Sequence, residues 1–142
     1  MKRDEAVNRA LDLMRASTVV YLGTNGPDGC PWIKAMLLME HEGLARVWFS
    51  TNTSSKRVAQ LRNDSRASVY AADPPTFRGL LLLGEAEVLE DPESKRRFWR
   101  EGFERYYPLG VEDPDYCVLR FTARTGNYYE MLENVTFGIP ET

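Results

Sequence analysis

The sequence of 142 residues is poor in the side chains that most often hold metal ions or form disulfide bonds. It contains two cysteines, Cys30 and Cys117, which are far apart along the chain, and one histidine, His41. A disulfide framework needs several paired cysteines, and a structural zinc site needs four Cys or His ligands at short spacing. The sequence therefore predicts no metal site. The cysteines are interpreted as free thiols in a reducing compartment, with a single disulfide as the alternative.

Long apolar runs and an excess of positive charge are also missing. The longest apolar run, Leu80 to Leu83, is far too short to cross a bilayer. Residues 1–5 carry several charges and lead into an amphipathic pattern, which is not typical of a signal peptide. With a formal net charge of −3, the chain lacks the basic excess typical of nucleic-acid-binding proteins. We therefore expect a soluble, cytoplasmic protein that binds neither membranes nor nucleic acid.

What the sequence does contain is enough apolar surface for a packed core. Hydrophobic residues make up 43% of the chain and aromatic residues 11%, as in globular proteins. We expect one domain over residues 1–142, because two halves would each be too small to bury a good core.

Three short helices are predicted. Apolar residues at helical spacing indicate the first, around residues 7–14. The hydroxyl-rich run after Ser50 is typical of a helix start and predicts the second, over residues 51–61. Asp91 followed by proline predicts the start of the third, and we expect Trp99, Phe103 and Tyr106 to share one face of it.

The remaining pattern is β structure. Glycine-rich turn sequences separate segments rich in branched and aromatic residues, and the first segments indicate an antiparallel meander. Gly84, in the middle of the longest segment, indicates a bulge or a barrel corner. Six or seven strands with inserted helices predict a β-barrel decorated by α structure. The predicted strands are 18–22, 33–39, 46–50, 67–71, 80–89, 117–122 and 128–132.

The most informative segment runs from Trp48 to Arg57 and joins four hydroxyl side chains, a helix start and two adjacent cations. Free N–H groups and the positive end of the helix dipole favour an anion at such a place. Hydroxyls add donors, and Lys56 or Arg57 can neutralise a phosphate. The same residues are also typical of a plain helix cap with two solvated cations, so this pattern alone leaves both interpretations open.

This segment resembles the FMN-phosphate segment of the pyridoxamine 5′-phosphate oxidases and their relatives. In that family an aromatic pair, Thr and Asn precede Ser, two basic residues and a helix. The neighbouring motifs also follow in a similar order, with a basic strand motif at 34–38, a helix end at 61–69 and a strand at 84–88. The resemblance covers residues 6–132 and is closest to the short, general-stress-protein-like bacterial branch. It implies a mainly β fold, a six- to seven-stranded antiparallel split β-barrel of the FMN-binding type.

The resemblance also implies a binding site and an assembly. Lys34 stands where the family places a cation for the phosphate or ribityl chain, and a lysine there lacks the two-pronged grip of arginine. Family members are homodimers that hold FMN in a groove between the subunits, and the same is expected here. The matched cofactor-binding positions on two strands and the helix start are Lys34, Ala35, Met36, Ser50, Thr51, Ser55, Lys56 and Arg57.

Several other residues have two interpretations each. Tyr128 and Tyr129 could border the flavin ring, although packing in a core or an interface is equally typical of tyrosine. His41 lies beside a predicted turn and is interpreted as solvated. Glu85 and Glu87 alternate along one strand face, which favours a solvated outer face over an acid–base pair.

The predicted function is FMN binding and flavin-dependent oxidoreduction of an unknown substrate. Two departures from the full oxidases argue against pyridoxamine phosphate oxidation. The chain has no counterpart of their C-terminal segment with arginine and histidine, and Arg78-Gly79 replaces a ring-contacting glutamine. The alternatives are a non-catalytic flavin carrier or redox sensor, and a binder of deazaflavin F420 or haem in the same groove.

Overall fold

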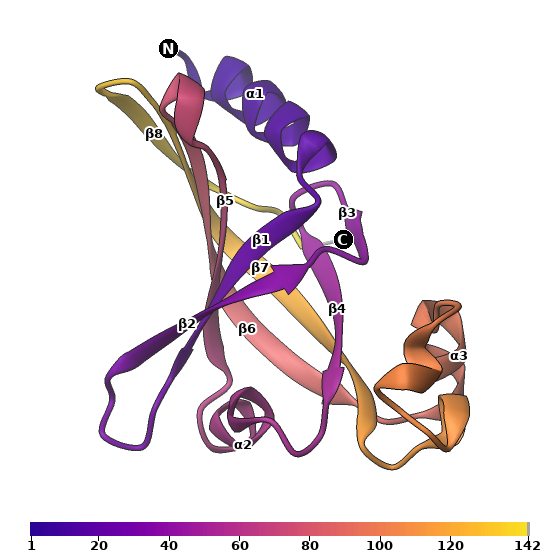
Figure 1. Cartoon of the computed structure of the whole chain (residues 1–142). Helices are drawn as coiled ribbons and strands as arrows, with labels where there is room; N and C mark the ends of the chain where they lie inside the picture. Colours follow the sequence, from indigo (N-terminus) through magenta and orange to yellow (C-terminus); the bar gives the residue numbers. More distant parts are fainter. Residues whose placement is uncertain (142) are drawn as a thin grey trace.

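The structure, a computed structural model that describes residues 1–141, contains one curled antiparallel sheet with short helices around it (Figure 1). The strands are β1 (Val19–Asn25), β2 (Pro31–Leu37), β3 (Glu40–Glu42), β4 (Arg46–Asn52), β5 (Arg66–Asp73), β6 (Arg78–Leu89), β7 (Tyr116–Glu130) and β8 (Glu133–Gly138). The helices are α1 (Arg3–Ala16), α2 (Lys56–Asn63) and α3 (Pro92–Phe98), with short 3-10 turns η1 (Pro74–Thr76), η2 (Phe103–Arg105) and η3 (Gly110–Glu112).

The sheet is a split β-barrel. Its strand order is β2-β1-β5-β6-β7-β4-β3, and β8 pairs with β7. The register between β6 and β7 shifts between Leu83 and Gly84, and a Cβ on Gly84 would lie 1.9 Å from the carbonyl oxygen of Thr122. Because only glycine allows so close an approach, the two long strands can bend here. The bulge predicted at Gly84 is confirmed.

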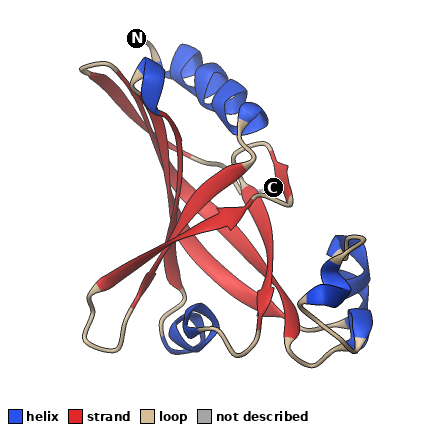
Figure 2. Ribbon diagram, in the orientation of Figure 1, coloured by secondary structure: helices blue, strands red, loops and turns tan. Residues whose placement is uncertain are grey.

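The main core fills the concave side of the sheet and is closed by helices at both ends (Figure 2). Side chains alternate along β1. Val20 and Leu22 are buried in the core, whereas Val19 and Tyr21 are exposed on the outer face, as the two-residue period of a strand requires. Helix α1, the predicted N-terminal helix, covers one end, and α2 covers the other with Val58 and Leu61.

The outer face of the sheet is covered on one side only. Residues 92–115, referred to below as the insert, pack an aromatic cluster over β4 and β7, in which Tyr116 is fully buried. The other side, formed by β1, β2, β5 and β6, carries exposed apolar side chains: Val19, Tyr21, Ile33, Leu37, Tyr70 and Leu83. Part of this barrel therefore presents an unpaired apolar surface.

The structure corrects several predicted boundaries. The described residues contain eight strands, against the six or seven predicted. The segments 117–122 and 128–130 belong to one strand, because β7 continues through the residues between them. Residues 131–132 form the turn to β8, which was not predicted. Val135, Phe137 and Ile139 do alternate with other residues and pack on the main core, so this short strand pattern was missed. His41 lies in β3, where it faces Val47, and is not in a turn.

The third helix is shorter than predicted. It begins at Pro92, as expected, but ends at Phe98, so that Trp99, Phe103 and Tyr106 do not share a helix face. Trp99 and Phe103 instead pack edge-on against Tyr116 of β7. The packing of these aromatic rings against the sheet, and not the helical spacing of the sequence, determines the position of Trp99 and Phe103.

Candidate functional site

A polar groove of about 500 Å³ lies where β2, the end of β4 and the start of α2 meet. The two-residue period of β2 turns Trp32 and Lys34 to the same side as buried Thr24 and Leu22, their partners on β1. The groove is lined by Thr24, Trp32, Ile33, Lys34, Asn52, Ser54, Ser55, Lys56, Arg57 and Gln60. It contains no acidic side chain, so its walls combine hydroxyls, amides and cations.

The loop before α2 is held in place by Asp115, the residue that precedes β7. The Ser54 N–H and the Thr53 hydroxyl donate to Asp115 Oδ1 over 2.9 and 3.0 Å. Hydrogen bonds from Ser54 and then Thr53 lower the pKa of Asp115, so its carboxylate stays charged at neutral pH. Ser55 caps α2 by accepting the N–H of Val58. The loop is therefore fixed before any ligand arrives.

The start of α2 also leaves backbone donors free. The first N–H groups of a helix have no partner within it, and the Ser55 hydroxyl takes that of Val58. The amides of Lys56 and Arg57 at the first two helical positions remain at the open end of the groove. With the positive end of the helix dipole, they favour a negatively charged ligand there.

Three cations share this groove without a carboxylate partner among the described residues. Lys34 reaches it from β2, and Lys56 and Arg57 reach it from α2, while the ion pairs elsewhere in residues 1–141 involve other basic residues. Like charges brought together repel unless an anion joins them. The arrangement therefore fits a ligand with a doubly charged phosphate.

Arg57 provides the most direct test of that fit. Its Nη2 donates to the Thr51 hydroxyl over 2.7 Å, but its buried Nε has no hydrogen-bond partner in the described part of the chain. Burial lowers the pKa of Arg57. Since a buried donor of a charged group is costly to leave unpaired, an anion oxygen at this position would satisfy it. The residues present therefore fit a bound phosphate.

Four of the predicted cofactor-binding residues, Lys34, Ser55, Lys56 and Arg57, line the groove together. Thr51 lies behind them and is linked to the groove through Arg57. Ser55, Lys56 and Arg57 are contiguous in the sequence, whereas Lys34, predicted from the family resemblance, reaches them from β2 through the fold.

The other predicted positions point elsewhere. The side chain of Ala35 is exposed opposite Tyr21 on the outer face of the sheet, and Met36 is buried in the core. Because β2 ends the sheet, backbone groups on its free edge are still available to a ligand. The Ser50 hydroxyl lies 3.2 Å from the Tyr116 hydroxyl, on the insert side of β4.

The two tyrosines predicted to border a ring lie at the opposite end of the barrel from α2. Tyr128 is fully buried in the main core, and its hydroxyl donates to Glu130. Tyr129 is paired with Gly79 of β6 and is partly exposed. Neither contributes to the groove within this chain.

Sequence reasoning missed several groove residues. Thr24 and Gln60 form a buried hydrogen bond of 2.6 Å at its floor, and Trp32, Asn52 and Ser54 complete its walls. The one local signal for this pair was Gln60, which lies between the apolar residues of a short helix. A buried amide there needs a hydrogen-bond partner.

The remaining polar residues lie outside the groove. His41 Nδ1 is 3.0 Å from the carbonyl oxygen of Gly43. Glu85 and Glu87 form ion pairs with Arg124 and Arg120 on the outer sheet face, which is the solvated face that the sequence favoured.

Three general findings concern residues 1–141 as a whole. Cys30 and Cys117 are free thiols, the first exposed and the second buried. No three His, Cys, Asp or Glu side chains within this range lie together in a way that could hold a metal ion. None of its helices has the length and apolar character needed to span a membrane.

The fold and the groove together define a split β-barrel protein with a cation-lined polar groove at the start of a short helix. The chain belongs to the pyridoxamine 5′-phosphate oxidase family, because the family model of pyridoxamine 5′-phosphate oxidase matches residues 7–130. No curated protein sequence matches the chain.

Solved structures agree with this family. A Clostridium acetobutylicum protein related to general stress protein 26 of B. subtilis, of the pyridoxinephosphate oxidase family, is 44% identical, with a TM-score of 0.87 and 97% of each chain covered. A pyridoxamine 5′-phosphate oxidase-related, FMN-binding protein from Nostoc punctiforme is 15% identical, with a TM-score of 0.64 and 96% of each chain covered. A haem-binding protein from Mycobacterium smegmatis is 19% identical, with a TM-score of 0.76, over 97% of this chain and 60% of that one. The last two show a shared fold alone.

Proposed function

We propose that the groove binds FMN and that the protein is a flavin-dependent oxidoreductase. The observation that carries this proposal is the convergence of Lys34, Lys56 and Arg57 without a carboxylate, with an unpaired buried Nε on Arg57. The FMN-binding neighbour supports the choice of cofactor within this fold. The cytoplasm stays the predicted compartment.

The residues have distinct tasks in this proposal. Lys56, Arg57 and the free amides at the start of α2 hold the phosphate, and Lys34 orients the chain that joins it to the ring. The open edge of β2, with Ala35 and Met36, offers backbone groups to the ring. Bound flavin supplies the redox chemistry, while the protein positions it and keeps water away. No side chain of the groove is assigned as a general acid or base.

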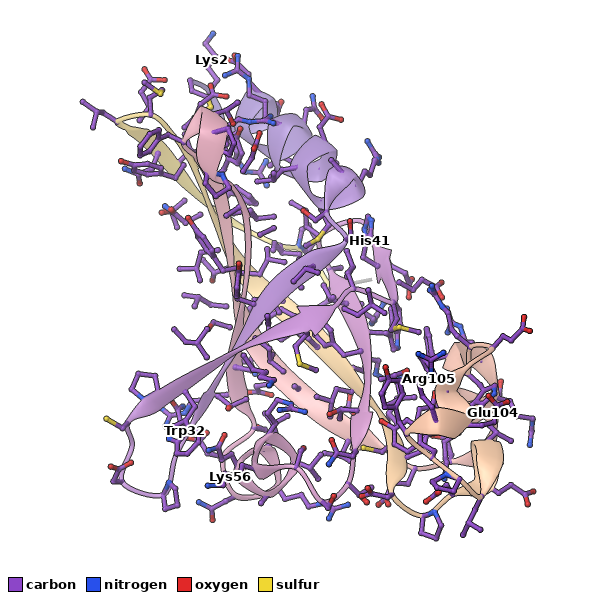
Figure 3. The ribbon with its side chains drawn as sticks, in the orientation of Figure 1. Lys2, Trp32, His41, Lys56, Glu104 and Arg105 are labelled. Atoms are coloured by element: carbon purple, nitrogen blue, oxygen red, sulfur yellow. The ribbon has the colours of Figure 1, made fainter. Side chains whose placement is uncertain are left out.

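The experiment is an FMN titration of the purified protein, followed by visible absorption and by heat release of the chromophore. Lys56→Glu places an anion against the phosphate and should weaken FMN binding by about 100-fold, because charge-assisted hydrogen bonds contribute ~1.5–3 kcal/mol. The matched control is Lys2→Glu, which makes the same charge change on an exposed residue at the other end of the molecule (Figure 3). FMN binding should be unchanged in this control.

Other outcomes decide between the alternatives. Unchanged FMN binding in Lys56→Glu would overturn the phosphate assignment. A haem Soret band or a deazaflavin spectrum in the purified protein would replace FMN with that cofactor. A flavin that NAD(P)H does not bleach at a useful rate would indicate a carrier or redox sensor instead of an oxidoreductase. Oxidation of pyridoxamine 5′-phosphate by the purified protein would contradict the prediction that it is not a full pyridoxamine phosphate oxidase.

We further propose that the protein is a homodimer with FMN at the subunit interface. The bare apolar face includes Tyr21, Leu37 and Tyr70 on three adjacent strands, and exposed apolar patches of this kind are typical of interaction sites. Ile33, which is 74% exposed, belongs both to this face and to the groove wall. A partner that covers the face would therefore also border the bound cofactor.

The oligomeric state tests this assembly. Leu37→Glu puts a charge on the proposed interface and should convert a dimer into a monomer in sedimentation velocity. Leu109→Glu is the control: Leu109 is 74% exposed, against 48% for Leu37, and it lies in the insert, away from the proposed interface. A wild-type monomer that holds FMN at full occupancy would exclude the intersubunit site.

A further inference from the structure

Trp32 of β2 and Lys56 of α2 meet at the mouth of the groove (Figure 3). The Lys56 ammonium lies 5.2 Å from the centroid of the Trp32 ring, within the distance of a cation–π interaction. Trp32 is 46% exposed and is not part of either hydrophobic core cluster. Within residues 1–141, the cation that lies over its ring is the Lys56 ammonium of the proposed phosphate site.

The hairpin between β1 and β2 leaves space for this indole. Gly26 follows β1, and a Cβ on it would lie 2.8 Å from Trp32 Nε1. The Gly26 N–H donates to the Cys30 carbonyl over 2.8 Å, which closes the turn. A larger side chain at position 26 would displace the ring from this position, so the turn and the ring position depend on each other.

The position of Lys56 is unfavourable without an additional partner. It occupies the first position of α2, where the helix dipole repels a cation, and no carboxylate among residues 1–141 pairs with it. A carboxylate partner would neutralise the ammonium and occupy its donors. An aromatic face holds the charge by its quadrupole and leaves N–H groups free to donate.

We propose that Trp32 is a positioning residue that holds Lys56 for a phosphate and thereby makes the groove select phosphorylated flavin over riboflavin. The inference rests on the proposed function, because it concerns the same groove. It adds a residue to which the family motif assigns no role, and it names the chemical feature, the terminal phosphate, that this residue recognises through Lys56.

The test compares the dissociation constants of FMN and riboflavin by quenching of flavin fluorescence. Trp32→Leu should weaken FMN binding roughly fivefold, the loss expected for an exposed cation–π contact, and change riboflavin binding much less. Trp32→Phe keeps an aromatic face and should retain most of the preference. Phe77→Leu removes an exposed aromatic ring from the turn between β5 and β6, outside the groove, and should leave both constants unchanged.

A double variant separates positioning from simple contact. With Lys56→Met already present, Trp32→Leu should cause no further loss of the FMN preference, because the residue that Trp32 positions is gone. An unchanged preference in Trp32→Leu, or equal losses for FMN and riboflavin, would overturn the inference while the proposed cofactor site stands. A wild-type protein that binds FMN no more tightly than riboflavin would overturn both.

Discussion

The groove end of the barrel and the insert both contain cations and aromatic residues, but the contacts of these side chains differ between the two regions. In the insert, Lys95 is only 8% exposed and donates to the Asp113 carbonyl over 2.9 Å, and Arg97 lies over Trp48 while it pairs with Glu40. In the groove, the cations lack carboxylate partners within the described residues. Buried cations whose donors are used inside the fold stabilise it, whereas the groove cations keep donors, such as Arg57 Nε, that have no partner in the described residues and can bind a ligand.

The aromatic residues of the two regions differ in the same way. Tyr116 is enclosed by Trp99, Phe103 and Tyr107, so it contributes to packing. Trp32 is half exposed and faces a cation. The insert therefore stabilises the outer face of the sheet, while the groove end keeps its polar groups ready for binding.

The largest effect is expected for Tyr116→Ala. Removal of a fully buried aromatic side chain leaves a cavity, and comparable substitutions cost about 3–5 kcal/mol of the free energy of unfolding. Urea denaturation followed by circular dichroism measures the loss. If Trp32→Ala destabilised the protein to the same extent, the proposed difference between a packed and a binding aromatic residue would be wrong.

Replacement of lysine by methionine in both regions gives the sharpest comparison. Lys95→Met leaves the Asp113 carbonyl without its donor in a buried place and should lower the free energy of unfolding by about 1–3 kcal/mol. Lys56→Met should change the free energy of unfolding by less than about 0.5 kcal/mol, but it should weaken FMN binding about tenfold. Stability comes from thermal or urea unfolding, and affinity comes from the FMN titration.

The opposite ranking would contradict the comparison. A strong loss of stability in Lys56→Met would mean that Lys56 is a structural residue. A loss of FMN affinity in a folded Lys95→Met variant would move the phosphate site towards the insert.

The smallest effect concerns alkaline pH. Burial raises the pKa of Cys117 and of Tyr107 to about 12 each, from ordinary values of 9.0 and 10.0. Both groups are neutral in the folded protein, so their contribution is complete below pH 9.0 and is lost as the pH rises towards 12. We expect a loss of about 1 kcal/mol at about pH 9.5.

Cysteine variants identify the group responsible for this pH dependence. Cys117→Ala should flatten the alkaline part of a plot of unfolding free energy against pH. Cys30→Ala alters the exposed thiol and should leave the plot unchanged. Iodoacetamide at neutral pH should correspondingly modify Cys30 in the native protein and spare Cys117. Equal rates of modification would show that Cys117 is not enclosed.

The sequence by itself determined the parts of this protein that depend on neighbours along the chain. Strand alternation, the Gly84 bulge and the start of α3 at Pro92 are local features, and the structure confirms them. Ser55, Lys56 and Arg57 are contiguous, so helix capping and charge indicated either a phosphate cradle or a plain helix cap there, and the family resemblance favoured the cradle.

Only the tertiary structure decided which distant residues join that cradle. Trp32 and Lys34 come to the groove because β2 pairs with β1, which in turn contacts α2 through the Thr24–Gln60 hydrogen bond, and no local pattern specifies these long-range contacts. The same pairing turns Met36 into the core, and Ser50 faces the insert through strand alternation. Since a one-residue change of register reverses every side chain of a strand, side-chain direction depends on the pairing of strands across the whole barrel.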